Sequence, residues 1–138
     1  MRKISVFIFT ILLFLSLIVL CGCDKNEPLL FFNSQPITRE TFNTPERHFS
    51  AGQTVHYVLL VPKGFKNEYI RAQIVKKDEK TPHWGYKVYQ SKDFRIDTTK
   101  NYFINSFVIH EPGYYFMQIF PFNDFDRPLV RNDFWIRP

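Results

Sequence analysis

The chemistry that is easiest to infer from this sequence belongs to two cysteines, Cys21 and Cys23, because residues 24–138 contain no other. Both stand in the stretch LCGCDK, directly after an apolar run from Ile4 to Leu20. An ionised thiol is a strong nucleophile, so a cysteine next to a bilayer can be alkylated there. Since residues 24–138 cannot form a disulfide, we expect the body of the protein to be held together by its core alone.

The first 22 residues have the pattern of a secretory signal. A positive start, Met1-Arg2-Lys3, is followed by the apolar run and by small residues at its exit. The run is 17 residues long, which is also the lower limit for a membrane span. A retained span and an ordinary cleaved signal are therefore alternatives to be weighed.

The ending Leu20-Cys21-Gly22-Cys23 resembles the lipobox of bacterial lipoproteins. The resemblance implies a signal peptide over residues 1–22, a lipid-modified Cys23 that becomes the new N-terminus, and loss of Cys21 with the signal. The sulfur of Cys23 would carry diacylglycerol and its amine a fatty acyl chain such as palmitate. Two or three chains anchor a protein persistently, at ~0.8 kcal/mol per buried methylene.

This resemblance predicts a membrane-anchored protein of the bacterial cell envelope, exposed to the periplasm. In enterobacterial lipoproteins an Asp directly after the lipidated Cys favours retention in the inner membrane, and Asp24 fits that pattern. Residues 23–28 would comprise the lipidated Cys and a short tether, of which the five residues Asp24 to Pro28 span at most ~18 Å between the bilayer and the folded domain. Such a tether favours partners that are themselves at the membrane.

No catalytic or metal-binding motif is found in the sequence. The four histidines show no HxxxH or HxH spacing, and neither a GxSxG turn nor a glycine-rich phosphate loop is present. Asp124 and Asp126 could form an acid/base pair or a Ca²⁺ loop, but an ordinary turn is favoured because Asp supports tight turns. We therefore expect no enzymatic activity, no cofactor and no metal. The histidines are His48, His56, His83 and His110.

Size and charge narrow the class of protein further. Residues 23–138 suffice for one domain and are too few for two. Without the signal, 16 basic and 13 acidic residues leave a charge of +3. This small positive charge and the predicted location in the cell envelope give no reason to expect nucleic acid as a partner.

The elements that must position any site are strands. Tyr69 to Ile74 alternates apolar and polar residues with a period of two, and the other apolar runs are β-branched or aromatic and bounded by Pro, Gly, Asn and Asp. We predict an all-β, antiparallel sandwich of seven to eight strands over residues 29–138. The predicted strands include residues 55–61, 69–74, 84–89, 102–109, 114–120 and 129–136.

Two stretches resemble strands of an immunoglobulin-like domain, and the resemblance covers residues 49–136. Gly52 to Leu59 is similar to the second strand, and Glu111 to Met117 is similar to the entry of the sixth. The resemblance implies that Tyr115 caps the corner through its hydroxyl. It also implies that Leu59 and Met117 replace the disulfide cysteines. The tryptophan of the third strand is missing, because Trp84 falls too late in the chain.

In such a sandwich the loops after the second and sixth strands lie at one end. Aromatic and charged side chains of these loops are candidates for an interaction site. The alternative is that Phe65 and Phe125 fold inward and plug the end of the sandwich. The candidate residues are Lys63, Phe65, Lys66, Phe122, Asp124, Phe125 and Arg127.

Two functions follow from these patterns. The first is a non-enzymatic, lipid-anchored binding or accessory module for a membrane-associated protein partner or complex. The second is an envelope ligand-binding protein or enzyme, with an aromatic-lined pocket for glycan or lipid. That pocket would lie among Trp84, Tyr86, Phe122 and Phe125.

Overall fold

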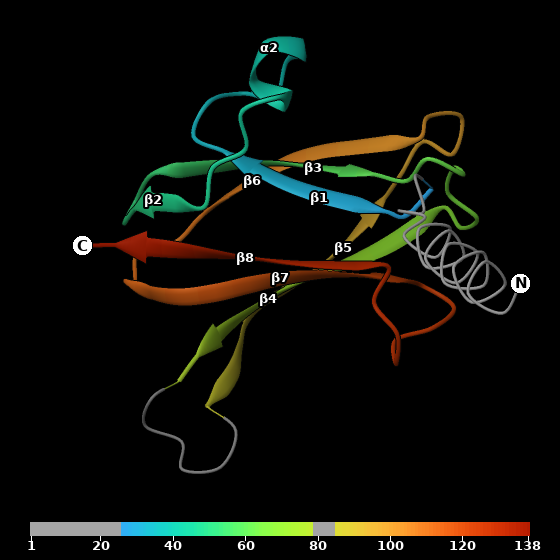
Figure 1. Cartoon of the computed structure of the whole chain (residues 1–138). Coiled ribbons are helices and arrows are strands. Elements are labelled where there is room, and N and C mark those ends of the chain that lie inside the picture. The colour runs from blue at the N-terminus through green and yellow to red at the C-terminus, as the bar shows by residue number, and fades with distance from the viewer. Residues whose placement is uncertain (1–25, 79–84) are drawn as a thin grey trace, which may run out of the picture.

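The computed structural model describes residues 26–78 and 85–138, so the signal segment, Cys23 and Trp84 lie outside the described residues. Within these ranges the chain forms eight β-strands and one short helix (Figure 1). The elements are β1 (Leu29–Asn33), α2 (Arg39–Phe42), β2 (His48–Ser50), β3 (Thr54–Leu60), β4 (Tyr69–Lys77), β5 (Tyr86–Arg95), β6 (Tyr102–Val108), β7 (Gly113–Pro121) and β8 (Val130–Arg137).

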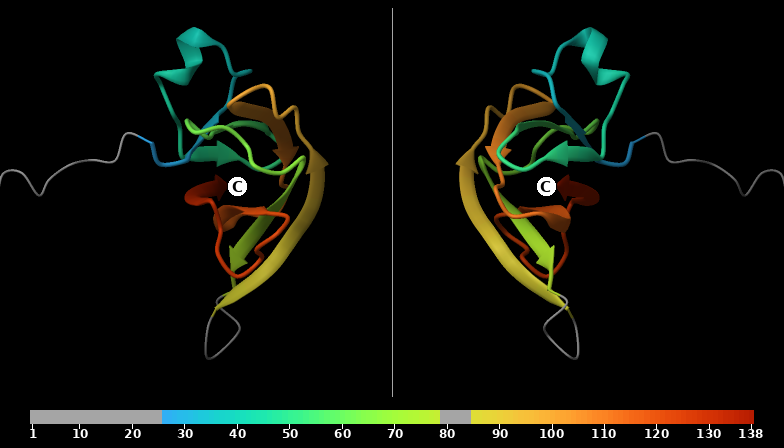
Figure 2. Two further views of the ribbon diagram at one scale, coloured as in Figure 1. Left: turned by 90° about the vertical axis from the view of Figure 1, so that its right-hand side faces the viewer. Right: turned by 90° about the vertical axis from the view of Figure 1, so that its left-hand side faces the viewer.

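The strands form two sheets that pack face to face (Figures 1 and 2). One sheet has the order β1-β3-β6, and the other has the order β2-β8-β7-β4-β5. All pairs are antiparallel except β2 with β8, which is parallel. The predicted all-β sandwich is thus confirmed.

The strand order is that of an immunoglobulin-like fold. If β1, β3 and β6 are its A, B and E strands, then β8, β7 and β4 are its G, F and C strands. β5 extends the second sheet beside β4, as in variable-type domains, and β2 extends it beside β8. No described strand takes the place of D beside β6, so one side of the sandwich is open between β5 and β6.

The core between the sheets is rich in aromatic rings. Phe134 of β8 is fully buried, and its ring lies 4.9 Å from that of Phe32 and 5.3 Å from that of Phe107. Leu59 and Met117, at the positions of the disulfide cysteines, belong to the same buried cluster. Rings from several strands therefore occupy the interior that a tryptophan on the C strand, here β4, would have helped to fill.

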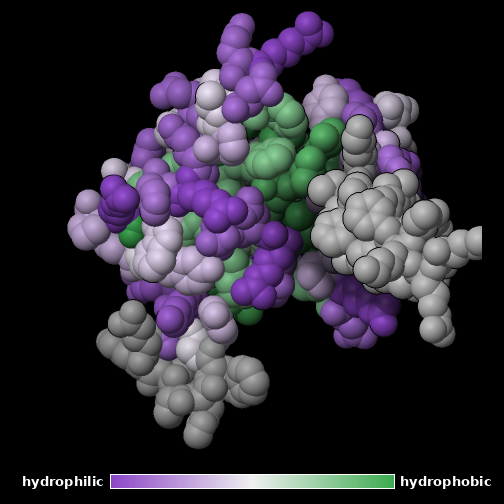
Figure 3. All heavy atoms as spheres, viewed as in Figure 1, coloured by the Kyte–Doolittle hydropathy of each residue, from purple (hydrophilic) through white to green (hydrophobic). Residues whose placement is uncertain are grey.

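The outer face of the three-stranded sheet is also apolar. Val58 of β3 lies between Phe31 and Ile104, and Leu60 lies one row further between Leu29 and Tyr102. Figure 3 shows this hydrophobic surface on the face that carries β1, below α2. β3 has apolar neighbours on both faces, which explains why its sequence is a continuous apolar run with no alternation.

The six predicted strands are confirmed where they fall on described residues, with ends that differ by a few positions. β5 extends to Arg95, beyond the predicted end at residue 89. The sandwich begins earlier than the immunoglobulin-like resemblance indicated, because β1 and β2 precede or overlap its start. Neither strand was among the predicted ones, since runs of five and three residues are too short to show a period.

Candidate functional site

Two loops meet at the end of the sandwich where the described chain begins, on the right of Figure 1. These are the β3–β4 loop (61–68) and the β7–β8 loop (122–129). The Asn67 side-chain amide donates a hydrogen bond to Asn123 Oδ1 at 3.2 Å and so joins them. A groove of about 490 Å³ runs between the loops and residues 26–28.

The predicted loop residues are brought to this one end, but they face different ways. Lys63, Lys66 and Asp124 line the groove. Phe65 also lines it and packs against the buried core, so the inward orientation holds for this ring. Arg127 is exposed on the neighbouring turn.

Phe122 and Phe125 do not plug the sandwich, because their side chains remain 40% and 44% exposed. Their rings lie 5.3 Å apart on the outer side of the five-stranded sheet. Tyr69 of β4, itself 43% exposed, has its ring 5.6 Å from Phe122. The inward orientation considered for Phe125 is therefore wrong: following Pro121, the chain turns toward the outer face.

Arg71 completes this group. Its guanidinium carbon lies 4.4 Å from the ring centroid of Phe125 and 5.7 Å from that of Phe122. We call Tyr69, Arg71, Phe122 and Phe125 the aromatic–arginine cluster. A guanidinium placed over an aromatic face is held there by the charge distribution of the ring.

Asp93 of β5 fixes the orientation of Arg71. Arg71 Nε donates to Asp93 Oδ1 at 2.7 Å, and Nη2 donates to Oδ2 at 3.0 Å. This two-point hydrogen bond to Arg71 lowers the pKa of the Asp93 carboxyl below its ordinary value. These hydrogen bonds hold the guanidinium in one position, and its flat face contacts the rings of Phe122 and Phe125.

The sequence did not single out Tyr69 or Arg71 as site residues. They are outward-facing positions of the alternating segment Tyr69 to Ile74, and an outward aromatic next to an outward arginine was the available signal. The signal did not show that the β7–β8 loop would bend onto them. The contact follows from the strand register. Ile70 of β4 lies opposite Pro121 at the end of β7, so the loop that begins after Pro121 starts beside Tyr69 and Arg71.

Asp124 has a structural role in its turn. Its Oδ1 accepts hydrogen bonds from the backbone N–H of Asp126 at 2.9 Å and of Arg127 at 3.3 Å. The carboxylate thereby closes the loop, which is the ordinary use of Asp in turns. Among residues 26–78 and 85–138, no three His, Cys, Asp or Glu side chains lie close enough together to hold a metal ion.

Tyr115 occupies the corner for which the sequence selected it. Its hydroxyl donates a hydrogen bond of 2.7 Å to the backbone carbonyl of Glu111, and the side chain has no exposed surface. Burial raises the pKa of the phenol, so it stays protonated and can donate. This is the tyrosine corner of immunoglobulin-like domains.

Of the aromatic residues proposed for a glycan or lipid pocket, Tyr86 is not brought together with Phe122 and Phe125. Tyr86 lies opposite Lys77, at one end of β4, and its ring packs 5.5 Å from that of Phe116. Phe122 and Phe125 lie beyond Pro121, at the other end of the same sheet. Trp84 is outside the described residues.

No family model and no curated protein sequence matches the chain. Among solved structures, an immunoglobulin-like protein from Pseudomonas aeruginosa is similar, with 14% sequence identity and a TM-score of 0.47 over 80% of this chain and 90% of the other. The immunoglobulin-like architecture described above rests on the strand order and the Tyr115 corner. No helix within residues 26–78 and 85–138 has the length and apolar character needed to span a bilayer.

Proposed function

We propose that this protein is a non-enzymatic, lipid-anchored binding module of the bacterial envelope, and that it holds a protein partner at the membrane through its aromatic–arginine cluster. The observation that carries the proposal is the exposure of Tyr69, Phe122 and Phe125 around an oriented guanidinium. Exposed rings are costly to leave in water, and aromatic and arginine side chains dominate the energetic centres of protein interfaces.

The position of the cluster relative to the proposed anchor supports a partner at the membrane. Residues 26–28 line the same groove as Lys63 and Asp124. Cys23 precedes Asn26 by three residues, and three residues span at most ~11 Å. A lipidated Cys23 would therefore keep this end of the domain close to the bilayer surface, with Lys63 and Lys66 facing its headgroups and the cluster at its side.

The experiment compares partner capture by three forms of the lipidated protein in native membranes. These are the wild type, the double variant Phe122→Ser/Phe125→Ser, and the control Tyr102→Ser, which removes an equally exposed ring from β6. After crosslinking at the membrane surface, we expect one partner species with the wild type and with the control. Its yield should fall by about tenfold or more in the double variant, since two hot-spot rings are lost.

Thermal unfolding of the three forms checks that the fold is retained, because all the altered rings are exposed. The proposal would be overturned if the same species were captured equally by the double variant. Absence of any specifically crosslinked protein with the wild type would overturn it as well.

A further inference from the structure

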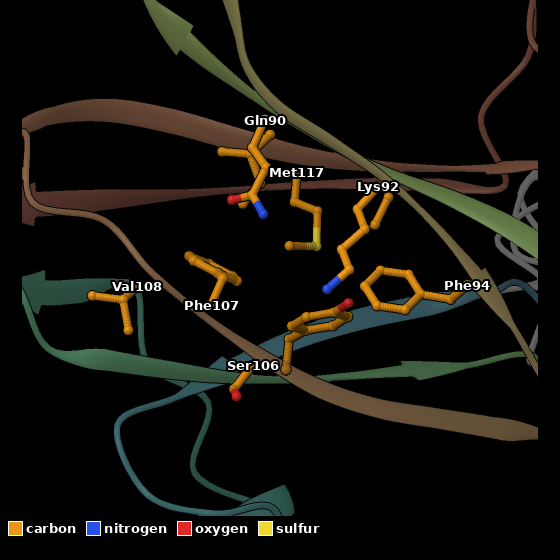
Figure 4. A pocket seen from close by; sticks show the side chains of 10 residues that line it. Gln90, Lys92, Phe94, Ser106, Phe107, Val108 and Met117 are labelled. Carbon is orange, nitrogen blue, oxygen red and sulfur yellow. The ribbon is translucent and has the colours of Figure 1, made fainter.

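A second candidate site lies on the open side of the sandwich. It differs from the aromatic–arginine cluster in its chemistry and in the kind of ligand that it would bind. β5 and β6 are edge strands of different sheets and are not hydrogen-bonded to each other. A cavity of about 130 Å³ lies between them and reaches the core (Figure 4). It draws side chains from β3, β4, β5, β6 and β7.

The floor of this cavity is apolar and its rim is polar. Ile74, Phe107 and Met117 form the floor and are all nearly or fully buried. Gln90 and Lys92 of β5 reach in from the rim, and Figure 4 shows their polar ends directed into the space between the sheets.

β5 places Lys92 on the inner side of the sandwich, at its open and solvent-exposed edge. Lys92 pairs in register with Ala72, and its neighbours two residues away, Gln90 and Phe94, pair with buried Ile74 and Ile70. None of the ion pairs found among the described residues includes Lys92. Its ammonium lies 5.2 Å from the ring of Phe94, so a cation faces the cavity without a carboxylate beside it.

Tyr57 brings a hydroxyl to the same cavity from the opposite sheet. Its side chain is only 2% exposed, yet it lines the cavity. Burial raises the pKa of this phenol, which therefore remains protonated and can act as a donor. An ammonium and a phenol at the edge of an apolar floor are complementary to a carboxylate carried on a small apolar body.

We propose that this cavity binds a small organic carboxylate, with the carboxylate accepting hydrogen bonds from Lys92 Nζ and the Tyr57 hydroxyl. The volume sets the size of the apolar part, since a cavity of about 150 Å³ accommodates benzene. At about 130 Å³ the cavity is slightly smaller than that, so the ring of a benzoate would fill it with its carboxylate at the open rim, and a long acyl chain would have to protrude. The inference does not depend on the proposed protein partner.

Another role for Lys92 has to be separated from ligand binding. A charged side chain that points inward on an edge strand also discourages pairing with other chains. That role requires the charge but no saturable site, so a binding measurement distinguishes the two.

The test is calorimetric titration of the mature, lipidated protein in detergent with sodium benzoate and, separately, with benzyl alcohol as the uncharged analogue. We expect saturable benzoate binding with a Kd of about 1 mM or lower, and benzyl alcohol at least about tenfold weaker. NMR of the Met117 and Ile74 methyl groups should show shifts that titrate with the same Kd.

Two variants locate the contacts, and a third serves as their control. Lys92→Met should weaken benzoate binding by about tenfold or more, and Tyr57→Phe by about fivefold, because each removes a donor and keeps most of the volume. Lys87→Met removes a lysine from the same strand that does not line this cavity, and should leave the Kd unchanged. The proposal is overturned if benzoate shows no saturable binding up to about 20 mM, or if Lys87→Met weakens it as much as Lys92→Met.

Discussion

Tyr115 shows how one side chain ties a turn to the core. Its hydroxyl bonds to the carbonyl of Glu111, and its ring lies parallel to that of Phe134 with an interplanar angle of 8° and a centroid distance of 5.6 Å. The turn that leads into β7 is thereby attached to β8, the neighbouring strand. In a domain with no cysteine after residue 23, such side-chain contacts take the place of a covalent link.

Removal of this hydroxyl alone should change the free energy of unfolding by a measurable amount. We expect Tyr115→Phe to lower the free energy of unfolding by about 1 kcal/mol, because it deletes one buried hydrogen bond and leaves the ring in place. Tyr102→Phe is the matched control, since Tyr102 is 43% exposed and should change stability by less than about 0.5 kcal/mol. Urea unfolding followed by tryptophan fluorescence gives both values, and equal effects of the two variants would contradict a special role for the corner.

Among the elements, β8 illustrates the two faces of a strand in this sandwich. Phe134 points inward and contacts the rings of Phe32, Phe49 and Phe107. Trp135, the next residue, points outward. It is 47% exposed, and its ring packs against that of Tyr114. Adjacent aromatic residues thus have opposite environments because side chains alternate along a strand.

This difference in burial predicts that truncation of Phe134 and of Trp135 will lower the free energy of unfolding by very different amounts. Phe134→Ala should lower the free energy of unfolding by about 3–5 kcal/mol, because it opens a cavity among several rings. Trp135→Ala removes a larger side chain but should cost less than about 1.5 kcal/mol, since it loses one ring pair at the surface. Chemical denaturation compares them, with Phe134→Leu as a milder variant if Phe134→Ala does not fold. A loss for Trp135→Ala as large as that for Phe134→Ala would refute the assignment of faces.

At the scale of the whole molecule, the proposed anchor would determine which surfaces reach a partner. The loop end with residues 26–28 would stay beside the bilayer, and the opposite end, with the C-terminus of β8, would point away from it. The aromatic–arginine cluster would then lie within reach of a membrane-embedded protein. This orientation depends on lipid at Cys23 and on the short segment that joins Cys23 to residues 26–28.

The anchor is tested by labelling with radioactive palmitate in a bacterial host. Cys21→Ala should keep the label, because this residue would leave with the signal and a small residue is retained there. Cys23→Ala should lose the label completely, since its sulfur is the proposed attachment atom. Mass spectrometry of the N-terminal peptide provides a second measurement. An unmodified thiol at Cys23, or label that persists in Cys23→Ala, would exclude the lipid anchor.

Much of the architecture could be predicted because its signals are local. The alternation of Tyr69 to Ile74, the apolar run of β3 and the turn before Tyr115 each indicate a structure within a few residues. β1 and β2 lacked such a signal, because their position depends on pairing with β3 and β8 and not on their own period. β5 was predicted too short for a related reason, since its polar residues are tolerated only at the edge of the sheet.

The amino-acid sequence alone determined that the domain is all-β, that no disulfide can form after residue 23, and that Tyr115 stands at a corner, because period, composition and turn chemistry act over short distances. Only the tertiary structure decided which side chains meet. Phe125 approaches Arg71 from a loop more than 50 residues later in the chain, and Lys92 shares a cavity with Tyr57 across two sheets. Such contacts follow from strand order and register, which pair distant segments according to the burial of the whole chain.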